Sequence, residues 1–343
     1  MHHHYTHYLQ LKVEHPRKYA RDLARMIGLS EAALTSLRVG HDARRLSGDM
    51  RALLAGLESV GETKSITRNE YAVHEQIGAY RNQRIGEHVG LVLNPRGLDL
   101  RLFPEQWDSA FALTEQTARG ERRSIQFFDR HGDAVLKVYA TDNTELTVWQ
   151  ALIDSFTLAD NPSLALQPAP TDAPAAAPDA ALLEQEWRAM TDVHQFFPLL
   201  KRHNVTRPQA FRAVSDDLAC QVDNQALGAL LHAAQQAGNE IMIFVGNRGC
   251  VQIFTGVIEK VTPMENWLNV FNRDFTLHLV ADAIAESWVT RKPTKDGIVT
   301  SLELFAADGT PIAQLFGQRS EGEPEQARWR EQVMSLVTPE AAA

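Results

Sequence analysis

The side chain best suited to chemistry in this sequence is His194, within the segment 190–208. Leu199 and Leu200 follow Phe196 at the spacing that places side chains on one buried face of a helix. An imidazole in an apolar setting can supply one axial bond to a haem iron, and phenylalanine rings suit the face of a porphyrin. The alternative is a hydrogen-bonded histidine of the core or of a helix cap, which is the commoner role for a lone histidine.

The residues that follow predict how His194 is positioned. Thr206 is a typical N-cap, and Pro208 lies close behind it, where the first turn of a helix tolerates proline. One helix therefore ends and another begins between Leu200 and Pro208. We expect His194 at or near a corner between helices.

The composition is that of an ordinary globular chain with room for two domains or one large one. Its 343 residues are 44% hydrophobic and 22% charged, and the formal net charge of -9 argues against general nucleic-acid binding. The sequence contains no apolar run long enough to span a membrane and no apolar core of a secretory signal. The two cysteines, Cys220 and Cys250, form no CxxC motif, which favours free thiols in a reducing cytoplasm over a disulfide.

A proline-rich stretch divides the chain. Residues 161–180 contain five of the 15 prolines and lack hydrophobic periodicity, which is typical of an extended, semi-rigid linker. The predicted organisation is an N-terminal repeat at 1–160, an Ala/Pro linker at 161–180 and a C-terminal repeat at 181–343, which carries His194.

The two sides of the linker resemble each other. Ser124 begins a pair of alternating strands joined by a glycine turn, and Ser301 begins another. Trp107 and Trp267 each precede a phenylalanine by four residues, which fits one face of a short helix or its approach. We predict a tandem duplication with an α+β fold, each half being helices followed by a large antiparallel sheet. Four matched pairs occur in the same order: 19–30 with 196–206, 94–103 with 247–254, 107–111 with 267–271, and 124–139 with 301–316.

The two halves also differ in length and in content. We expect additional residues in the first half around 69–75 and in the second half around 288–297. His194 has no histidine at the matching position of the first half. The duplication therefore predicts one site rather than two.

Five stretches of the sequence are especially distinctive: residues 19–23, 68–75, 99–103, 191–197 and 291–297. With them the chain resembles the HemS/ChuS/HmuS-type haemin-degrading and haem-trafficking proteins of Gram-negative bacteria, over nearly its whole length apart from the linker. The resemblance implies that the repeats assemble as one body with large twisted antiparallel sheets. It also implies that haem, iron protoporphyrin IX, binds in a cleft between the halves as ligand and substrate.

The resemblance assigns His194 as the axial ligand of the iron and Arg101 as a distal arginine over the opposite face of the haem. In residues 98–103 the alternation of a strand places Arg101 and Phe103 on one face. A guanidinium above the iron can hold a water molecule or donate hydrogen bonds to bound oxygen. Without the resemblance, Arg101 is interpreted as a solvent-facing strand residue.

The resemblance also implies the rest of the pocket. Lys292, Arg319 and Arg207 are expected to contact the two haem propionates, because carboxylates need cationic partners, although each alone is more often a surface charge. Where the family is expected to have a tyrosine at the haem edge, this chain has Phe316, which removes one hydroxyl hydrogen bond. His74 is expected to be a secondary site, as a transient acceptor during haem transfer. The remaining pocket residues that the resemblance implies are Phe103, Phe244 and Gln314.

Two functions compete for this site. The first is oxidative cleavage of the porphyrin with release of iron, for which Arg101 is the expected catalytic residue. The sequence has no GxGxxG motif and no glycine-rich phosphate loop, so the electrons are expected from a partner reductase or a small reductant. The second function is a non-enzymatic carrier that takes haem from an inner-membrane importer to a separate haem oxygenase. In either case we expect a cytoplasmic protein that is not embedded in a membrane.

Overall fold

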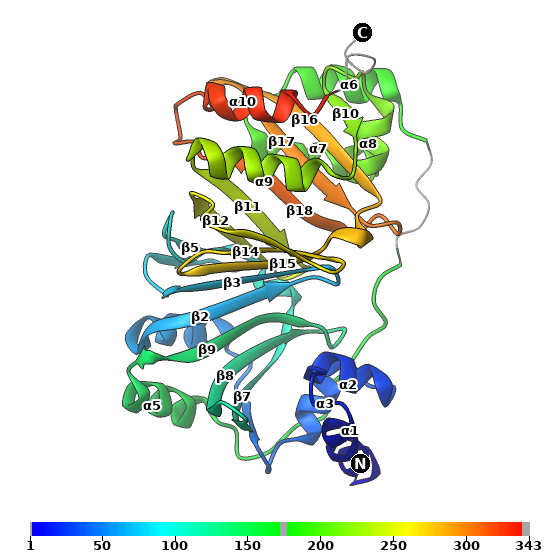
Figure 1. The fold of residues 1–343 in the computed structure, drawn as a ribbon. Coiled ribbons are helices and arrows are strands. Elements are labelled where there is room, and N and C mark those ends of the chain that lie inside the picture. The colour runs from blue at the N-terminus through cyan, green and yellow to red at the C-terminus, as the bar shows by residue number, and fades with distance from the viewer. Residues whose placement is uncertain (1, 172–176, 338–343) are drawn as a thin grey trace. The chain divides into compact units, whose positions relative to one another are not determined.

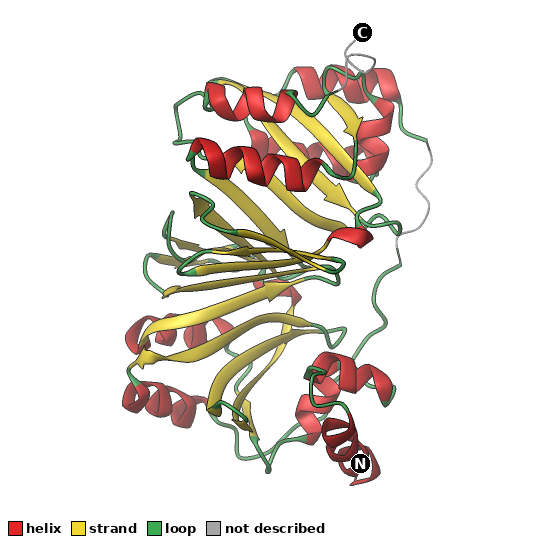
Figure 2. Ribbon diagram, in the orientation of Figure 1, coloured by secondary structure: helices red, strands yellow, loops and turns green. Residues whose placement is uncertain are grey.

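The computed structural model describes residues 2–171 and 177–337, which form two compact units of helices and strands (Figure 1). Each unit contains one short segment from the other half of the chain. Unit 1 comprises Met1–Arg68, Glu75–Pro170 and Asn247–Gln252, and unit 2 comprises Asn69–His74, Thr171–Gly246 and Ile253–Ala343. Figure 2 shows helices beside the strands of both units.

Unit 1 is built around the strand order β1-β7-β8-β9-β2-β3, and β4, β5 and β6 form a second antiparallel run. The pairs from β1 to β2 in this order are antiparallel. The elements of the first half are α1 (His2–Glu14), α2 (Ala20–Met26), α3 (Glu31–Leu37), β1 (Ala43–Leu46), α4 (Met50–Gly56), η1 (Leu57–Val60), β2 (Gly61–Arg68), β3 (Ala72–Ala79), β4 (Gln83–Ile85), β5 (Gly90–Leu93), β6 (Asp99–Leu102), η2 (Pro104–Gln106), β7 (Trp107–Thr117), β8 (Gly120–Asp129), β9 (Ala134–Thr144) and α5 (Leu146–Phe156).

Unit 2 is built around the order β10-β16-β17-β18-β11-β12, with β13, β14 and β15 as a second antiparallel run. Helices α9 and α10 pack with the strands in one apolar core. The elements of the second half are α6 (Ala180–Arg188), η3 (Val193–Gln195), α7 (Phe196–His203), α8 (Arg207–Ala213), β10 (Ala219–Val222), α9 (Ala226–Ala237), β11 (Ile241–Gly246), β12 (Cys250–Gly256), β13 (Val261–Met264), β14 (Trp267–Phe271), β15 (Phe275–Val280), η4 (Ala281–Ala283), β16 (Glu286–Thr294), β17 (Gly297–Phe305), β18 (Pro311–Gly317) and α10 (Ala327–Met334).

The two strand orders correspond element by element, which confirms the predicted tandem duplication and its α+β fold. The hairpins that the sequence matched even share one register. Ser124 of β8 lies opposite Tyr139 of β9, and Ser301 of β17 lies opposite Phe316 of β18.

The helical openings of the two halves correspond as predicted. Ser30 caps α3 and Thr206 caps α8, each by accepting a hydrogen bond from the backbone N–H three residues on. Phe196 and Leu199 of α7 are buried, as their spacing indicated. The helix ends at Asn204, whose left-handed φ of 50° suits asparagine.

The short helices predicted after Trp107 and Trp267 are wrong. Trp107 begins strand β7 and Trp267 begins strand β14. These strands are not counterparts either, because β7 lies between β1 and β8, whereas β14 lies between β13 and β15. A spacing of four residues places two side chains on one face in a strand as well as in a helix, so the pattern did not distinguish them. The counterpart of β7 is β16, so the predicted insertion at 288–297 is also wrong.

The turns before β3 and β12 require a second correction, because Asn69, and not Asn94, is the counterpart of Asn247. Each side-chain oxygen accepts hydrogen bonds from the backbone N–H groups two and three residues on, at 2.9–3.0 Å. Each amide nitrogen donates to a matching carbonyl at 2.9 Å, Asn69 to Ile312 and Asn247 to Val135. Residues around 69–75 are therefore part of the repeat and not an addition to it.

Asn247→Ala is expected to lower the free energy of unfolding by about 2–4 kcal/mol, because it removes four hydrogen bonds that hold one turn in unit 1. Asn69→Ala is expected to cost a similar amount in unit 2. Urea titrations followed by circular dichroism measure both, with the exposed Asn266→Ala as a control that changes little. A free energy of unfolding that falls no more than in the control would show that these turns do not stabilise their units.

The first part of the predicted linker is packed on unit 1. The side-chain amide of Asn161 donates to the backbone carbonyl of Ser36 at 3.0 Å, and the backbone N–H of Gln167 donates to the backbone carbonyl of Arg130 at 2.9 Å. Residues 172–176 of the predicted linker lie outside the described residues.

Cys220 and Cys250 are free thiols, as predicted, and both are buried. Burial raises the pKa of Cys250 to about 12, so this thiol is unreactive. Within residues 2–171 and 177–337, the structure contains no helix that is both long and apolar enough for a membrane span.

Candidate functional site

His194 lies in η3, immediately before α7, at the corner between helices that the sequence predicted. Its side chain is 90% exposed, so the apolar setting expected for it is wrong and a core histidine is excluded. The alternative of a histidine at a helix cap stands, because the ring bonds the N-cap residue Asp192. The carboxylate of Asp192 accepts hydrogen bonds from the backbone N–H of His194 at 2.8 Å and from its ring Nδ1 at 2.7 Å. With the proton on Nδ1, the lone pair of the ring is on Nε2, which is how metal-ligating histidines are commonly held.

Asp192 is a site residue that sequence reasoning missed. It forms a capping box with Gln195, whose side chain accepts from the backbone N–H of Asp192 at 3.3 Å. The backbone N–H and the ring of His194 hold the pKa of Asp192 below its ordinary value, so the orienting carboxylate is ionised. An aspartate two residues before a histidine, at the start of a helix, is the signal that could have identified it.

Aromatic packing in the core holds helix α7, which directly follows the turn that contains His194. Phe196 is buried, with its ring centre 4.6 Å from that of Trp187 and with Phe211 on another side. Phe197 is the next residue and points the other way, with 72% of its surface exposed. An exposed aromatic ring therefore lies three residues from an exposed imidazole.

A buried charged cluster lies beside Phe196 in unit 2. Lys292 of β16 and Arg207 of α8 both contact Glu303 of β17, with Nζ 3.1 Å from Oε1 and Nε 3.5 Å from Oε2. Both cations also face the ring of Phe196, at 4.6 and 5.0 Å from its centre. With its amide oxygen toward Arg207, Gln314 accepts from that guanidinium at 3.2 and 3.3 Å. Glu303 was not predicted from the sequence.

The three cations predicted for the propionates differ in accessibility. The side chain of Lys292 is 3% exposed, and burial lowers its pKa, although Glu303 opposes the shift. Arg207 and Arg319 are each 22% exposed, and Arg319 lies 3.9 Å from a carboxylate oxygen of Asp296. All three cations lie beside a carboxylate, but Arg207 and Arg319 are partly exposed, whereas Lys292 is buried. The propionate contacts of all three stay predictions.

Two aromatic residues of the predicted pocket lie together on one half-exposed sheet face. Phe244 of β11 and Phe316 of β18 have ring centres 5.1 Å apart, and Phe244 lies opposite Gln314 in the strand register. Ile243 and Leu315, which directly precede these two phenylalanines in their strands, are buried in the core. This alternation brings the aromatic surface and Gln314 to the same face.

Arg101 and Phe103 belong to unit 1, whereas the other predicted site residues belong to unit 2. Arg101 alternates with the buried Leu100 and Leu102 along β6, as predicted, and Phe103 directly follows the strand. The guanidinium of Arg101 is 31% exposed and lies 2.5 Å from Asp99. Its role as the distal arginine stays a prediction.

His74 lies on β3 and is completely buried, which differs from the accessible position expected of a transient haem acceptor. Its ring centre is 4.8 Å from that of Phe275, and neither ring nitrogen has a hydrogen-bond partner among the described residues. Burial lowers the pKa of His74 to about 3, so the ring is neutral. A role in haem transfer stays a prediction and requires β3 to expose this ring.

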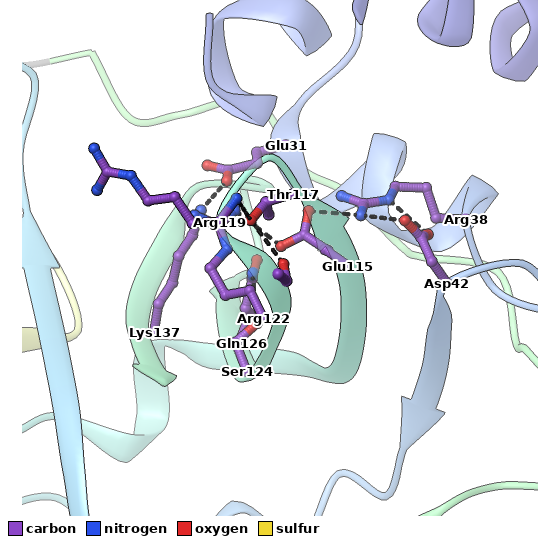
Figure 3. Close-up of polar contacts among 11 residues, drawn as sticks. Glu31, Arg38, Asp42, Glu115, Thr117, Arg119, Arg122, Ser124, Gln126 and Lys137 are labelled. Carbon is purple, nitrogen blue, oxygen red and sulfur yellow. Dashed lines mark hydrogen bonds and ion pairs between the residues drawn. The ribbon is translucent and has the colours of Figure 1, made fainter. Parts of the chain in front are cut away.

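Unit 1 has a different charged network at the corresponding place, which Figure 3 shows. Gln126 occupies on β8 the place of Glu303 on β17, and Glu31 begins α3 as Arg207 begins α8. The charge at the start of the helix is therefore reversed, from Arg207 in unit 2 to Glu31 in unit 1. Glu31 forms a buried ion pair with Lys137 of β9.

The rest of this network is also balanced internally. Arg38 contacts Asp42 at 2.7 Å and Glu115 at 2.8 Å, and Arg122 lies 3.0 Å from the second oxygen of Glu115. With Lys137 and Glu31, three cations are paired with three carboxylates. The unit 2 cluster of Lys292, Arg207 and Glu303 has two cations and one carboxylate, and this excess of positive charge favours an acidic ligand.

These residues fit a metalloporphyrin with acidic side chains. The described part of the chain contains no group of three or more histidine, cysteine, aspartate or glutamate residues that could hold a free metal ion. A haem iron needs only one such ligand from the protein, because the porphyrin nitrogens supply four others. An oriented Nε2, exposed aromatic rings and accessible guanidinium groups match the iron, the macrocycle and the propionates.

The chain is similar in sequence and in structure to known proteins. The family described as "Haemin-degrading HemS.ChuX domain" matches the chain twice, over residues 28–156 and 204–336. The chain is 66% identical over 340 residues to the hemin transport protein HmuS of Yersinia pestis, with 99% of both chains covered.

Two solved structures superimpose over almost the whole length. The heme degrading enzyme ChuS of Escherichia coli O157:H7 has a TM-score of 0.94 at 63% identity, with 98% of this chain and 99% of that chain covered. Holo-PhuS, a heme-binding protein from Pseudomonas aeruginosa, has a TM-score of 0.95 at 42% identity, with 98% of both chains covered.

Proposed function

Because the chain belongs to the haemin-degrading HemS/ChuX domain family, we propose that it binds haem through His194 and cleaves the porphyrin oxidatively, with release of iron. The observation that carries this proposal is the Asp192–His194 pair. An exposed histidine whose Nδ1 donates to a carboxylate has its ring orientation fixed and presents Nε2 as a ligand for the iron.

The other residues of unit 2 orient the ligand. Arg207 and Arg319, whose side chains are partly exposed, bind the propionates, and Lys292 is the third proposed cation, paired with Glu303 beside Arg207. Phe244 and Phe316 pack on the macrocycle, with Gln314 beside them. Haem, when bound, supplies the iron and the oxidisable ring.

Arg101 and Phe103 are the proposed residues of the distal side. A guanidinium keeps its positive charge at any working pH, so Arg101 stabilises negative charge that develops on oxygen as the ring is attacked. The electrons come from a partner reductase or a small reductant. An inner-membrane importer delivers the haem, which places this chain in the cytoplasm.

A second candidate function is haem carriage without degradation. It is favoured by the names of two relatives, since HmuS is called a hemin transport protein and PhuS a heme-binding protein, whereas ChuS is called a heme degrading enzyme. In this case the haem passes unchanged to a separate oxygenase. The same axial ligand and propionate contacts serve both functions.

Aerobic incubation of the haem complex with a reductant and catalase distinguishes the two functions. Catalase removes the free peroxide that destroys haem without enzymatic turnover. We expect the Soret band to disappear with release of iron and formation of an open-ring product, while free haem in the same mixture reacts much more slowly. Haem that stays intact with catalase present would leave carriage as the function.

A further inference from the structure

The carboxylate of Glu303 is enclosed in unit 2, with no exposed side-chain surface. Its Oε1 accepts from Lys292 Nζ at 3.1 Å and from the hydroxyl of Ser301 at 3.3 Å. Its Oε2 accepts no hydrogen bond among the described residues and lies 3.5 Å from Arg207 Nε. This buried carboxylate oxygen is thus stabilised by nearby positive charge and not by a hydrogen bond of its own.

The neighbouring strands supply no further charge to Glu303. Trp288 of β16 and Gln314 of β18 lie opposite it in the register, and the hydroxyl of Thr290 binds Lys292 at 2.8 Å. Burial favours the protonated form of the carboxyl, but Arg207 and Lys292 outweigh burial and hold the pKa of Glu303 below its ordinary value. The ionised state of Glu303 therefore depends on these two cations.

Arg207 is shared between the buried carboxylate and the surface. Its side chain is 22% exposed, and it is one of the cations proposed for a haem propionate. In the first half the position that corresponds to Glu303 is Gln126, which is neutral and donates to the hydroxyl of Ser124 at 3.0 Å. A carboxylate at this place is thus a feature of the copy that carries His194.

We propose that Glu303 is an internal counterion that a haem propionate replaces, and that Glu303 takes up one proton when the propionate binds Arg207. The inference rests on the proposed haem binding. A second carboxylate at Arg207 neutralises the charge that supports Glu303 and repels it directly, and of two carboxylates that share a site one has its pKa raised. The proton comes from solvent, and the carboxylate becomes a carboxylic acid with no other change of bonds.

Proton uptake makes haem affinity depend on pH in a defined direction. Without haem, Glu303 is ionised above its lowered pKa, and with haem it is protonated below a raised pKa. Between the two values, haem affinity falls as pH rises, by up to about tenfold per pH unit for one proton. Below the lower pKa, Glu303 is protonated in both states and this dependence disappears.

The proton count is measured by titration calorimetry with hemin at about pH 6, in buffers of different ionisation enthalpy. An imidazole that ligates iron must be deprotonated, so the contribution of Glu303 is the difference between the variants. We expect the wild-type chain to take up close to one proton more per hemin than Glu303→Gln, whose affinity falls less steeply as pH rises. The matched control is Glu325→Gln, another buried carboxyl of unit 2, which pairs with Arg330 at 2.9 Å and is expected to behave as wild type.

A second ligand tests the same idea without a mutation. The dimethyl ester of hemin retains the iron and the macrocycle but has no propionate charges, so the wild-type chain is expected to bind it without taking up this proton. Equal proton uptake with hemin and its ester, or in wild type and Glu303→Gln, would overturn the role of Glu303. Hemin binding that does not depend on His194, or no binding, would overturn the proposed haem site itself.

Discussion

Arg101→Ala is expected to bind haem nearly as well as the wild-type chain but to degrade it on the order of a hundredfold more slowly. In the proposed site, haem is bound by His194 and by the cations of unit 2, which this substitution leaves in place. Oxidation of the ring develops negative charge on oxygen, and the loss of one preorganised donor typically raises such a barrier by roughly 3 kcal/mol.

Arg101→Ala also removes a structural contact, because Arg101 pairs with Asp99. Burial raises the pKa of Asp99, and Arg101 opposes the shift, so Arg101→Ala leaves a buried carboxyl without its cation. Arg101→Lys keeps a positive charge beside Asp99 but loses the planar fork of donors. We expect this variant to melt as wild type does and to degrade haem at an intermediate rate.

The rate is measured as loss of the Soret band in one turnover, with a reductant and catalase present, and the products are identified afterwards. Fast, catalase-resistant breakdown in both wild type and Arg101→Ala would support an enzymatic function but contradict the distal role of Arg101. If the wild-type chain gives no breakdown, Arg101 has no reaction to accelerate and carriage is the function.

His194→Ala is expected to shift the Soret band and to weaken haem binding by at least tenfold, because the proposed axial bond to the iron is removed. Binding is not abolished, since the propionate contacts and the aromatic face remain. Asp192→Asn is the informative companion, because it keeps the imidazole but replaces the carboxylate that fixes its Nδ1 proton. We expect a smaller loss of affinity, about tenfold, with an almost unchanged spectrum.

His203→Ala is the control for these titrations. His203 lies on α7 at the end away from His194, and its Nε2 is 3.0 Å from a carboxylate oxygen of Glu186. We expect its spectrum and affinity to match wild type. An unchanged Soret band in His194→Ala, together with a shifted one in His203→Ala, would show that the wrong histidine was assigned.

The parts of the fold that depend on neighbouring residues could be predicted from the sequence. Ser30 and Thr206 identify helix starts because a cap is a contact within four residues, and the glycine turns identify hairpins for the same reason. The strands at Trp107 and Trp267 could not be identified, because a spacing of four residues occurs on one face of either element.

The site shows the same division between local and long-range contacts. The corner with His194 was predicted, because the aromatic and leucine spacing of α7 is local. The burial of Lys292 was not, because it depends on Glu303, eleven residues along the chain on the next strand. The equivalence of Asn69 and Asn247 was missed for a similar reason, since their defining partners, Ile312 and Val135, lie over a hundred residues away.

Each unit contains a short segment from the other half of the chain, and this arrangement affects how the protein folds during synthesis on the ribosome. Unit 1 lacks Asn247–Gln252 until long after Pro170 has been made, and at about 5–20 residues per second this delay lasts several seconds. Until then β6 has no partner along the edge that later pairs with Cys250–Gln252, and an unpaired edge strand invites association with other chains. The nascent first half therefore cannot complete its fold alone, and its exposed edge has to be protected until the second half emerges.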